Sequence, residues 1–369
     1  MRKCHIPTPA LVVDLDKLQR NIDEMAARAR RAGVALRPHT KTHKTPIIAH
    51  MQLRAGACGI VCAKLGEAEV MAAAGIEDIW ICYPLVGPDK LERLLNLARW
   101  APRISTTVDT YPAARALSEA ALARAQRIDV MVEVDVGYQR TGLPAGEPVV
   151  SFVREIASAM PGLRYKGLMY IAGKVCDFLE PEKQLAEERR AAGLVVDCAR
   201  QLAAYGIETP VLSGGTTPGA RYLGQVAGIT EYRPGCYVFG DVKYADLGAM
   251  RLDQLALTVL TTVVSVPGSV PAGHFVVDAG SKTLTHSGAF STPGYGLIAQ
   301  LPGVTVSMAS EEHGTVRLPP DTPPPPLGTR LDIYPNYVSD AVNLADELWV
   351  VQGDQVVAVW KIQGRGKRV

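Results

Sequence analysis

The chain has 369 residues, 47% of them hydrophobic, and a formal net charge of +2. It is long enough for a large core, and we expect one large domain with a smaller one beside it. No long basic or aromatic-interleaved run supports a nucleic-acid partner, and no segment reaches the roughly 18 apolar residues of a membrane span. We expect a soluble, cytoplasmic protein whose seven scattered cysteines are mostly buried, reduced thiols.

Short apolar segments alternate with stretches of helical period along the first two thirds of the chain. The segment ALVVDL comes before a helix that begins at Asp16, places Leu18 and Ile22 on one face and ends at Gly33. Seven more apolar segments follow, each separated by room for one helix: GVALRP, CGIVCA, DIWICYP, RISTTVD, IDVMVEVD, YKGLMYI and TPVLSGG. Eight such units predict a parallel (β/α)8 barrel rather than an open doubly wound sheet.

The pattern changes after residue 240. The apolar segments LTVLTTVVSV, HFVVDAG, TVSMASEEHG, RLDIYP, ELWVVQGD and QVVAVWKIQG are separated by turns, with no amphipathic helix between them. This spacing predicts a β domain. The proline run at 321–328 is expected to be a surface loop within it.

Residues that can carry chemistry follow four of the predicted barrel strands. The second strand runs into LRPHTKTHKTP, the sixth into EVDVGYQRTG with Arg140, the seventh ends at Tyr170, and the eighth ends in LSGGTTPG. Active residues of such barrels lie at the carboxyl ends of the strands. These four segments are therefore expected to share one mouth.

The segment LSGGTTPG has the composition of an anion site. Gly214 and Gly215 allow backbone N–H groups to approach a ligand, while Ser213, Thr216 and Thr217 add hydroxyl groups. A helix N-terminus after the turn would favour an anion further, and the RPGCYVFGD segment at 233–241 is expected to close the site. An ordinary strand-to-helix turn remains the alternative.

Lys41 is the candidate nucleophile of the second strand end. Its expected neighbours Arg37, His39, His43 and Lys44 would lower its pKa and leave the amine free to form a Schiff base. Neutralising a phosphate is the alternative role of the segment. A metal pair of the two histidines is disfavoured, because the proline before His39 opposes the helix that this spacing requires.

Together these segments resemble one family. LRPHTKTHKTP, KLGEAEVMAAAGI, EVDVGYQRTG, SGGTTP, EYRPGCYVFGD, VVDAGSKTL and EEHG occur in the order found in the D-threonine aldolase and D-serine dehydratase family, from about residue 6 to about residue 350. These pyridoxal 5'-phosphate (PLP) enzymes have the alanine-racemase-like barrel known as fold type III. The resemblance implies a PLP-binding (β/α)8 barrel at 9–240 and a β domain at 1–8 and 241–369.

The resemblance also implies roles for individual residues. Lys41 would form the Schiff base with PLP, with His39 shaping its surroundings. The residues expected to bind the cofactor are Lys41, Arg140, Tyr170, Ser213, Gly214, Gly215, Thr216, Thr217, Gly235, Cys236 and Tyr237. A homodimer with active sites near the subunit interface, acting on a small amino-acid substrate, is implied as well.

The chain departs from the family at the metal-binding segment. Characterised members hold a divalent metal in a PNHxC or PNHxD segment, and here the segment reads PNYVSDAVN. Tyr337 and Ser339 stand at the two ligand positions, and a phenol and a hydroxyl are poor ligands for Zn²⁺ or Mn²⁺. We predict no metal there, although Asp340 or His313 could support a shifted site.

The predicted function is a metal-independent lyase that cleaves β-hydroxy-D-amino acids to glycine and an aldehyde, as a D-threonine aldolase does. Tyr337 is a candidate donor or base at the β-hydroxyl, with filling of the vacated space as the alternative. Met169 and Ile171 also replace family residues, which affects substrate selection. The alternatives are a D-serine or 3-hydroxyaspartate type dehydratase, a metal-independent racemase or other PLP enzyme that forms a bond at Cα, and a catalytically silent PLP carrier.

Overall fold

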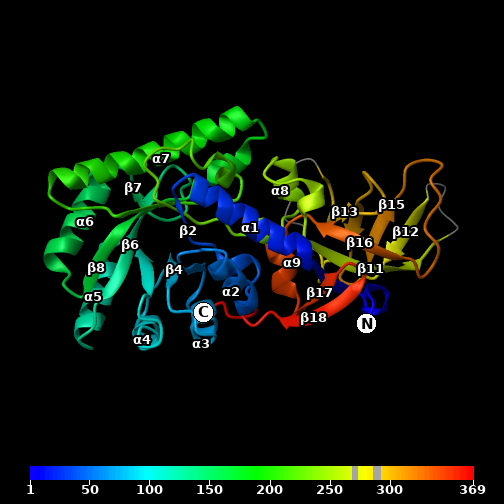
Figure 1. The fold of residues 1–369 in the computed structure, drawn as a ribbon, viewed down its shortest axis with the longest axis horizontal. Coiled ribbons are helices and arrows are strands. Elements are labelled where there is room, and N and C mark those ends of the chain that lie inside the picture. The colour runs from blue at the N-terminus through cyan, green and yellow to red at the C-terminus, as the bar shows by residue number, and fades with distance from the viewer. Residues whose placement is uncertain (268–272, 286–291) are drawn as a thin grey trace. The chain divides into compact units, whose positions relative to one another are not determined.

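The computed structural model describes residues 1–267, 273–285 and 292–369, and within these the chain forms two compact units (Figure 1). The barrel unit consists of Glu24–Gly235 and Gly366–Val369, and the β unit consists of Met1–Asp23 and Cys236–Arg365. Helix α1 (Leu15–Arg31) is shared between them. It buries Leu18 and Ile22 and stops before Gly33, whose φ of 66° suits glycine.

The barrel unit is built on parallel strands in the spatial order β2-β10-β9-β8-β6-β5-β4-β3. Their bounds are β2 (Ala35–Leu36), β3 (Ile60–Cys62), β4 (Ile79–Pro84), β5 (Ser105–Val108), β6 (Ile128–Asp135), β8 (Leu163–Met169), β9 (Val211–Gly214) and β10 (Glu231–Tyr232). The short strand β7 (Leu143–Pro144) pairs with β6. The two ends of this order meet where the Val61 N–H donates to the Pro38 carbonyl at 2.8 Å and His39 bridges Val61. The parallel sheet therefore curls into a barrel.

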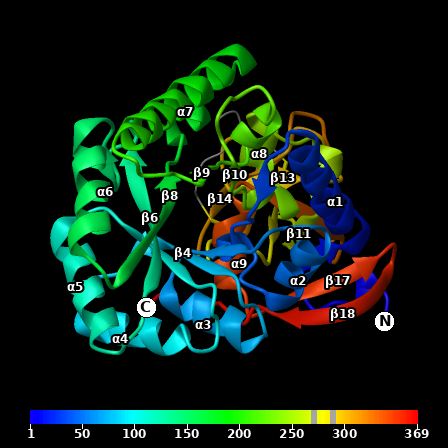
Figure 2. The ribbon, with the colours of Figure 1, turned by 60° about the vertical axis from the view of Figure 1, so that its left-hand side comes forward.

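Helices follow the strands and lie outside them (Figure 2). They are α2 (Pro46–Arg54), α3 (Leu65–Ala73), α4 (Pro88–Leu97), α5 (Tyr111–Leu122), α6 (Glu147–Ala159) and α7 (Pro181–Ala204). Five of them have proline in the first turn, where its missing N–H breaks no helical hydrogen bond. Inside the barrel, a core cluster joins Val61, Trp80, Met131 and Met169.

The β unit has its own sheet. Its strands are β1 (Ala10–Asp14), β11 (Leu257–Ser265), β12 (His274–Val277), β13 (Gly296–Ile298), β14 (Val306–Ala309), β15 (Gly314–Arg317), β16 (Arg330–Pro335), β17 (Glu347–Gln352) and β18 (Gln355–Lys361). Two short helices, α8 (Val242–Asp246) and α9 (Val338–Leu344), accompany it. Alternate residues of β16 are buried, as expected for a half-buried strand.

The predicted architecture is confirmed, but the eight strands are not the eight expected. ALVVDL does not enter the barrel: β1 pairs antiparallel with β11 and parallel with β17. The eighth barrel strand is β10, a two-residue strand between β9 and β2 that is too short to show a period in the sequence. The observed units consequently divide near residues 23 and 235, whereas the predicted barrel extended from 9 to 240.

Three smaller expectations can be compared with the described residues. The β unit was expected to lack a helix between its strands, and α9 between β16 and β17 shows that this was wrong. All seven cysteines are free, but only three are buried, while Cys4 and Cys58 are exposed. Within the described part of the chain, no helix is long and apolar enough to cross a membrane.

Candidate active site

Lys41 lies in a short 3-10 helix, η2 (Thr40–Thr42), just beyond strand β2. The backbone before it is fixed on both sides, because the His39 N–H donates to the Pro234 carbonyl at 3.0 Å and the Thr40 hydroxyl donates to the Val61 carbonyl at 3.0 Å. The Lys41 N–H approaches His39 Nδ1 at 3.4 Å. The lysine is thus carried by a rigid strand end, as the sequence predicted.

The imidazoles near Lys41 are buried and uncharged at neutral pH. Burial lowers the pKa of His39 well below its ordinary value, and the nearby charges of Lys41 and Arg233 lower it further. Burial lowers the pKa of His43 to about 4. His43 Nδ1 accepts the Thr45 N–H at 3.1 Å, which requires an unprotonated nitrogen.

The other two basic neighbours are paired with carboxylates. Lys44 Nζ lies 2.9 Å from the Glu67 carboxylate, and the guanidinium of Arg37 binds Asp78 and Glu231. The predicted free amine of Lys41 therefore cannot be argued from four positive neighbours. The segment holds two neutral imidazoles and two charges that are locally balanced.

The glycines after β9 are places of close approach. A Cβ on Gly214 would lie 2.7 Å from the Tyr170 hydroxyl oxygen, and one on Gly215 would lie 2.9 Å from the Arg233 backbone nitrogen. Because no side chain fits at either position, only the peptide groups of Gly214 and Gly215 are available to bind a ligand there. The predicted helix N-terminus is absent from the described turn: only η4 (Gly219–Tyr222), a 3-10 helix, follows it.

Thr216 and Thr217 differ in their contacts. The Thr216 hydroxyl donates to Glu188 at 3.4 Å and accepts the Gly219 N–H at 3.0 Å, and the Thr216 N–H lies 3.4 Å from the Tyr232 hydroxyl oxygen. Thr216 is therefore tied into the wall of the barrel. Thr217 is buried next to it and remains a predicted phosphate ligand.

Ser213 belongs to a buried hydrogen-bond network. Its hydroxyl donates to Glu231 at 2.8 Å and accepts from Arg233 Nε at 2.8 Å. Arg233 also donates to the Tyr170 carbonyl at 2.7 Å and stacks on Trp80 with its guanidinium carbon 4.8 Å from the ring centroid. Sequence reasoning missed Arg233 as the side chain that joins three strand ends, although it stands in the RPGCYVFGD segment singled out at 233–241.

Tyr170 directly follows β8, and Arg140 lies in the segment between β6 and β7. Among the described residues, the Tyr170 hydroxyl is buried without a hydrogen-bond partner, and burial raises its pKa well above the ordinary value. Arg140 is half-exposed, with Nη2 3.8 Å from Glu133. Glu133 is a buried carboxyl whose pKa burial raises, and it also escaped the sequence prediction.

Gly235 brings the segment that follows β10 against the Lys41 segment. A Cβ there would lie 3.1 Å from both the His39 carbonyl oxygen and the Thr42 hydroxyl. The chain then enters η5 (Cys236–Val238), where Cys236 and Tyr237 are buried. Within the barrel unit the predicted residues thus converge on adjacent strand ends, from β6 through β8, β9 and β10 to β2.

This convergence fits a phosphorylated aromatic aldehyde such as PLP. Gly214, Gly215 and Gly235 leave backbone in place of side chains, which suits a phosphate. The unpartnered phenol of Tyr170 is a donor of the kind that a heteroaromatic ring or its substituents would accept. An amine follows on the neighbouring strand end, at Lys41.

The 335–340 segment, where the family holds its metal, lies in the β unit. Tyr337 caps helix α9, and its pKa is raised by the Cys236 thiol and by burial. The Ser339 hydroxyl lies 3.4 Å from the Cys236 sulfur, and Lys243 Nζ lies 5.5 Å from the centre of the Tyr337 ring. A protonated phenol, a hydroxyl and an ammonium nearby do not fit a divalent cation.

A buried carboxyl anchors that segment. Asp241 accepts the Tyr244 N–H at 2.9 Å and the Val338 N–H at 2.9 Å, so it links the starts of α8 and α9. Burial raises the pKa of Asp241 to about 7. Across the described residues, no cluster of three or more His, Cys, Asp or Glu side chains is placed to hold a metal, near His313 and Asp340 or elsewhere.

Comparison with known proteins agrees with this arrangement. A family model described as "Alanine racemase, N-terminal domain" matches residues 13–243, and one described as "Putative serine dehydratase domain" matches residues 256–351. D-threonine aldolase of an Arthrobacter species is 37% identical over 366 residues, covering 98% of this chain and 93% of that protein. The chain belongs to the D-threonine aldolase and D-serine dehydratase family. It is a lyase of fold type III.

Further relatives of this family differ in their reactions. D-threo-3-hydroxyaspartate dehydratase of a Delftia species is 34% identical over 348 residues, covering 90% of each chain. The crystal structure of D-threonine aldolase from Filomicrobium marinum has a TM-score of 0.92 at 35% identity and covers 99% of this chain and 98% of its own. Aldolases and dehydratases thus share this fold with similar identity.

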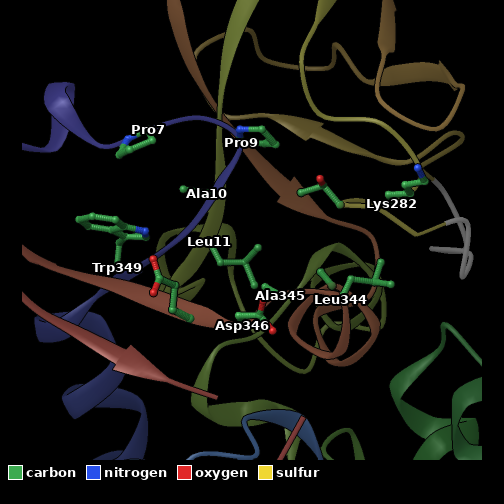
Figure 3. Close-up of a pocket in the computed structure, with 12 residues that line it drawn as sticks. Pro7, Pro9, Ala10, Leu11, Lys282, Leu344, Ala345, Asp346 and Trp349 are labelled. Carbon is green, nitrogen blue, oxygen red and sulfur yellow. The ribbon is translucent and has the colours of Figure 1, made fainter. Parts of the chain in front are cut away.

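The β unit also contains a cavity of about 280 Å³ (Figure 3). Figure 3 shows Lys282 on one side of it and Trp349, from β17, on the other. Its lining is Pro7, Pro9, Ala10, Leu11, Lys282, Thr283, Ala341, Leu344, Ala345, Asp346, Glu347 and Trp349. This set contains none of the predicted cofactor-binding or catalytic residues.

Proposed function

We propose that this chain is a PLP-dependent lyase that cleaves β-hydroxy-D-amino acids to glycine and an aldehyde without the divalent metal of its family. The observation that carries the proposal is the placement of Lys41 on a strand end next to the Gly235 segment, with the Gly214–Thr217 turn one strand further along. The 37% identity to an aldolase supports the reaction type.

Different residues of the barrel unit would bind different parts of the coenzyme. The backbone of Gly214, Gly215 and Gly235, together with Thr217, would hold the phosphate, and Tyr170 would orient the ring. Lys41 would supply the amine that attaches the coenzyme. When bound, PLP withdraws electrons from the Cα bond that stands perpendicular to its ring, and the protein selects which bond that is.

His39 would hold the backbone of Lys41 in place without adding a positive charge beside it. Its imidazole is buried and neutral, and its Nδ1 faces the Lys41 N–H. A neutral neighbour leaves the Lys41 amine as the group that takes up or returns a proton at the substrate. We propose that His39 acts through this positioning.

Tyr337 would replace the metal as the group that acts on the β-hydroxyl. Its pKa is raised, so at neutral pH it is a phenol and can donate a hydrogen bond rather than accept a proton. This refines the sequence-based alternatives, which left donor and base open. Met169, the last residue of β8, and Ile171 just after it are proposed to contribute to substrate selection.

Dehydration is the second candidate reaction. The 34% identity to D-threo-3-hydroxyaspartate dehydratase, with a TM-score of 0.90 to its crystal structure, supports it almost as well as the aldolase similarity supports cleavage. A dehydratase must expel hydroxide from Cβ, which a Lewis acid assists. Because characterised members of the family hold a metal in this segment, its donor set does not separate the two reactions, and the higher identity to an aldolase places cleavage first.

Two assays test the proposal. Borohydride treatment of the protein with PLP should fix the coenzyme on the peptide containing Lys41, and Lys41→Ala should abolish the attachment. Incubation with D-threonine, D-phenylserine and D-serine then separates the reactions: aldehyde indicates an aldolase, keto acid a dehydratase, and solvent deuterium at Cα alone a racemase. Loss of activity on treatment with EDTA would contradict the metal-independent reaction.

The family resemblance further suggests a homodimer, which light scattering of the purified chain would establish.

A further inference from the structure

Glu188, on helix α7, carries a buried carboxyl group. It is not among the cofactor-binding residues proposed above. It is 1% exposed, and its Oε1 accepts the Tyr232 hydroxyl at 2.8 Å and the Thr216 hydroxyl at 3.4 Å. The Thr216 N–H in turn reaches the Tyr232 hydroxyl oxygen at 3.4 Å. One carboxyl thus engages the end of β10 and the turn after β9 together.

The space around this carboxyl is closed by the turn itself. A Cβ on Gly219 would overlap both the Glu188 carboxylate oxygen and the Tyr232 hydroxyl, so the turn folds directly over them. Gly219 is also the donor whose N–H binds the Thr216 hydroxyl at 3.0 Å. The turn from Gly215 to Gly219 therefore rests on Glu188 and Tyr232.

A carboxyl beneath a phosphate site would ordinarily repel the ligand, and here the surroundings reduce that repulsion. Burial is the largest cause that raises the pKa of Glu188 to about 7; the hydrogen bonds from Tyr232 and Thr216 oppose this rise, and the charge of Glu187 on the same helix adds to it. A substantial fraction of Glu188 is therefore neutral at physiological pH. A neutral carboxyl can still accept both hydrogen bonds through Oε1.

We propose that Glu188 is a positioning residue for the phosphate of the cofactor: it holds Thr216 against the barrel wall so that the peptide groups of Gly215 and Thr217 are directed to the phosphate. The inference rests on the proposed PLP-binding function. It assigns Thr216 to the support of the turn, and leaves direct phosphate contact to its neighbours.

The test compares two ligands that differ only in the phosphate. Dissociation constants for PLP and for pyridoxal, which lacks the phosphate, are measured by fluorescence titration of the full chain freed of cofactor. Glu188→Ala should weaken PLP binding by about tenfold or more while changing pyridoxal binding by less than about twofold. Glu188→Gln keeps a carbonyl oxygen at the Oε1 position and should bind PLP like the wild type.

Two further variants control the experiment. Tyr232→Phe removes the hydroxyl between Glu188 and Thr216 at almost constant volume, and it should show the same selective loss if Glu188→Ala fails to fold. Asp197→Asn removes an exposed carboxylate of the same helix, paired with Arg200, and should change neither constant.

The outcomes separate the inference from the proposed function. Equal weakening of PLP and pyridoxal, or no weakening in Glu188→Ala and Tyr232→Phe, would overturn the role of Glu188 while leaving PLP binding intact. Failure of the wild type to bind either ligand would overturn the proposed function, and the inference with it. Selective loss of PLP with recovery in Glu188→Gln supports the inference.

Discussion

The buried carboxyl of Glu188 should make the stability of the barrel unit depend on pH. The group has an ordinary pKa of 4.5 and a folded-state pKa of about 7, because burial penalises its charged form. A raised carboxyl pKa means that the stabilisation is complete below about 4.5 and is lost as the pH rises through about 7. The difference between the two pKa values corresponds to a change of roughly 3 kcal/mol in the free energy of unfolding. Roughly 2.5 kcal/mol of this change occurs between pH 5 and pH 9.

Glu188→Gln isolates this effect, since its amide is neutral at every pH and its carbonyl oxygen can accept from Tyr232 and Thr216. The variant should gain thermal stability relative to the wild type as the pH rises from 5 to 9. For a unit of this size the gap in Tm should widen by about 5–10 °C. Asp241, whose pKa is also raised to about 7, is present in both proteins and cancels in the comparison.

The measurement is a pair of thermal denaturation series, followed by circular dichroism at five pH values for each protein without cofactor. Tyr232 and Tyr170 remain protonated across this range because burial raises the pKa of each well above its ordinary value. Parallel Tm curves for the two proteins would refute the reasoning, since they would show that Glu188 does not change protonation over this range.

The other predictions concern Lys41, Gly219 and the segment that contains Tyr337 and Ser339. Lys41→Ala should reduce lyase activity by about a thousandfold or more, measured as aldehyde release, with Tm unchanged within about 2 °C. Gly219→Ala should destabilise the barrel unit by about 1–3 kcal/mol, measured by urea denaturation, because its Cβ would overlap Glu188 and Tyr232. Gly193→Ala, which has open space around it and no positive φ, is the control and should not destabilise the unit. Tyr337→Phe should lower kcat for β-hydroxy substrates about tenfold or more while leaving the PLP dissociation constant unchanged, and Tyr337→His combined with Ser339→Cys should make activity sensitive to EDTA if the metal site is restored.

The barrel could be predicted because its strands are buried on both faces and its helices carry regular apolar stripes. Segments such as DIWICYP stand out as apolar runs, and seven of the eight expected strands occur where the sequence placed them. The error at ALVVDL has a physical cause. β1 is also buried, so periodicity cannot distinguish a barrel strand from one that pairs with β11 and β17.

The candidate site could likewise be predicted only in part from the sequence. The motifs predicted which strand ends would carry chemistry, and the structure shows that those strands are neighbours. The charge state around Lys41 could not be read from residue types, because it depends on carboxylates that come from elsewhere in the chain: Glu67 beside Lys44, and Asp78 and Glu231 beside Arg37. Glu188 was missed for a similar reason, since within α7 it is one of several acidic residues and only the fold shows that it is buried.

The position of β1 has a consequence for how the chain is made. Ala10–Asp14 leaves the ribosome early, but its hydrogen-bonding partners on β17 lie more than three hundred residues later in the sequence. At ordinary translation rates this strand waits for tens of seconds before its partners emerge. The segment from Glu24 to Gly235 is contiguous and can fold during that interval. We therefore expect nascent chains stalled after residue 235 to protect the barrel from proteolysis while leaving their first residues open to cleavage.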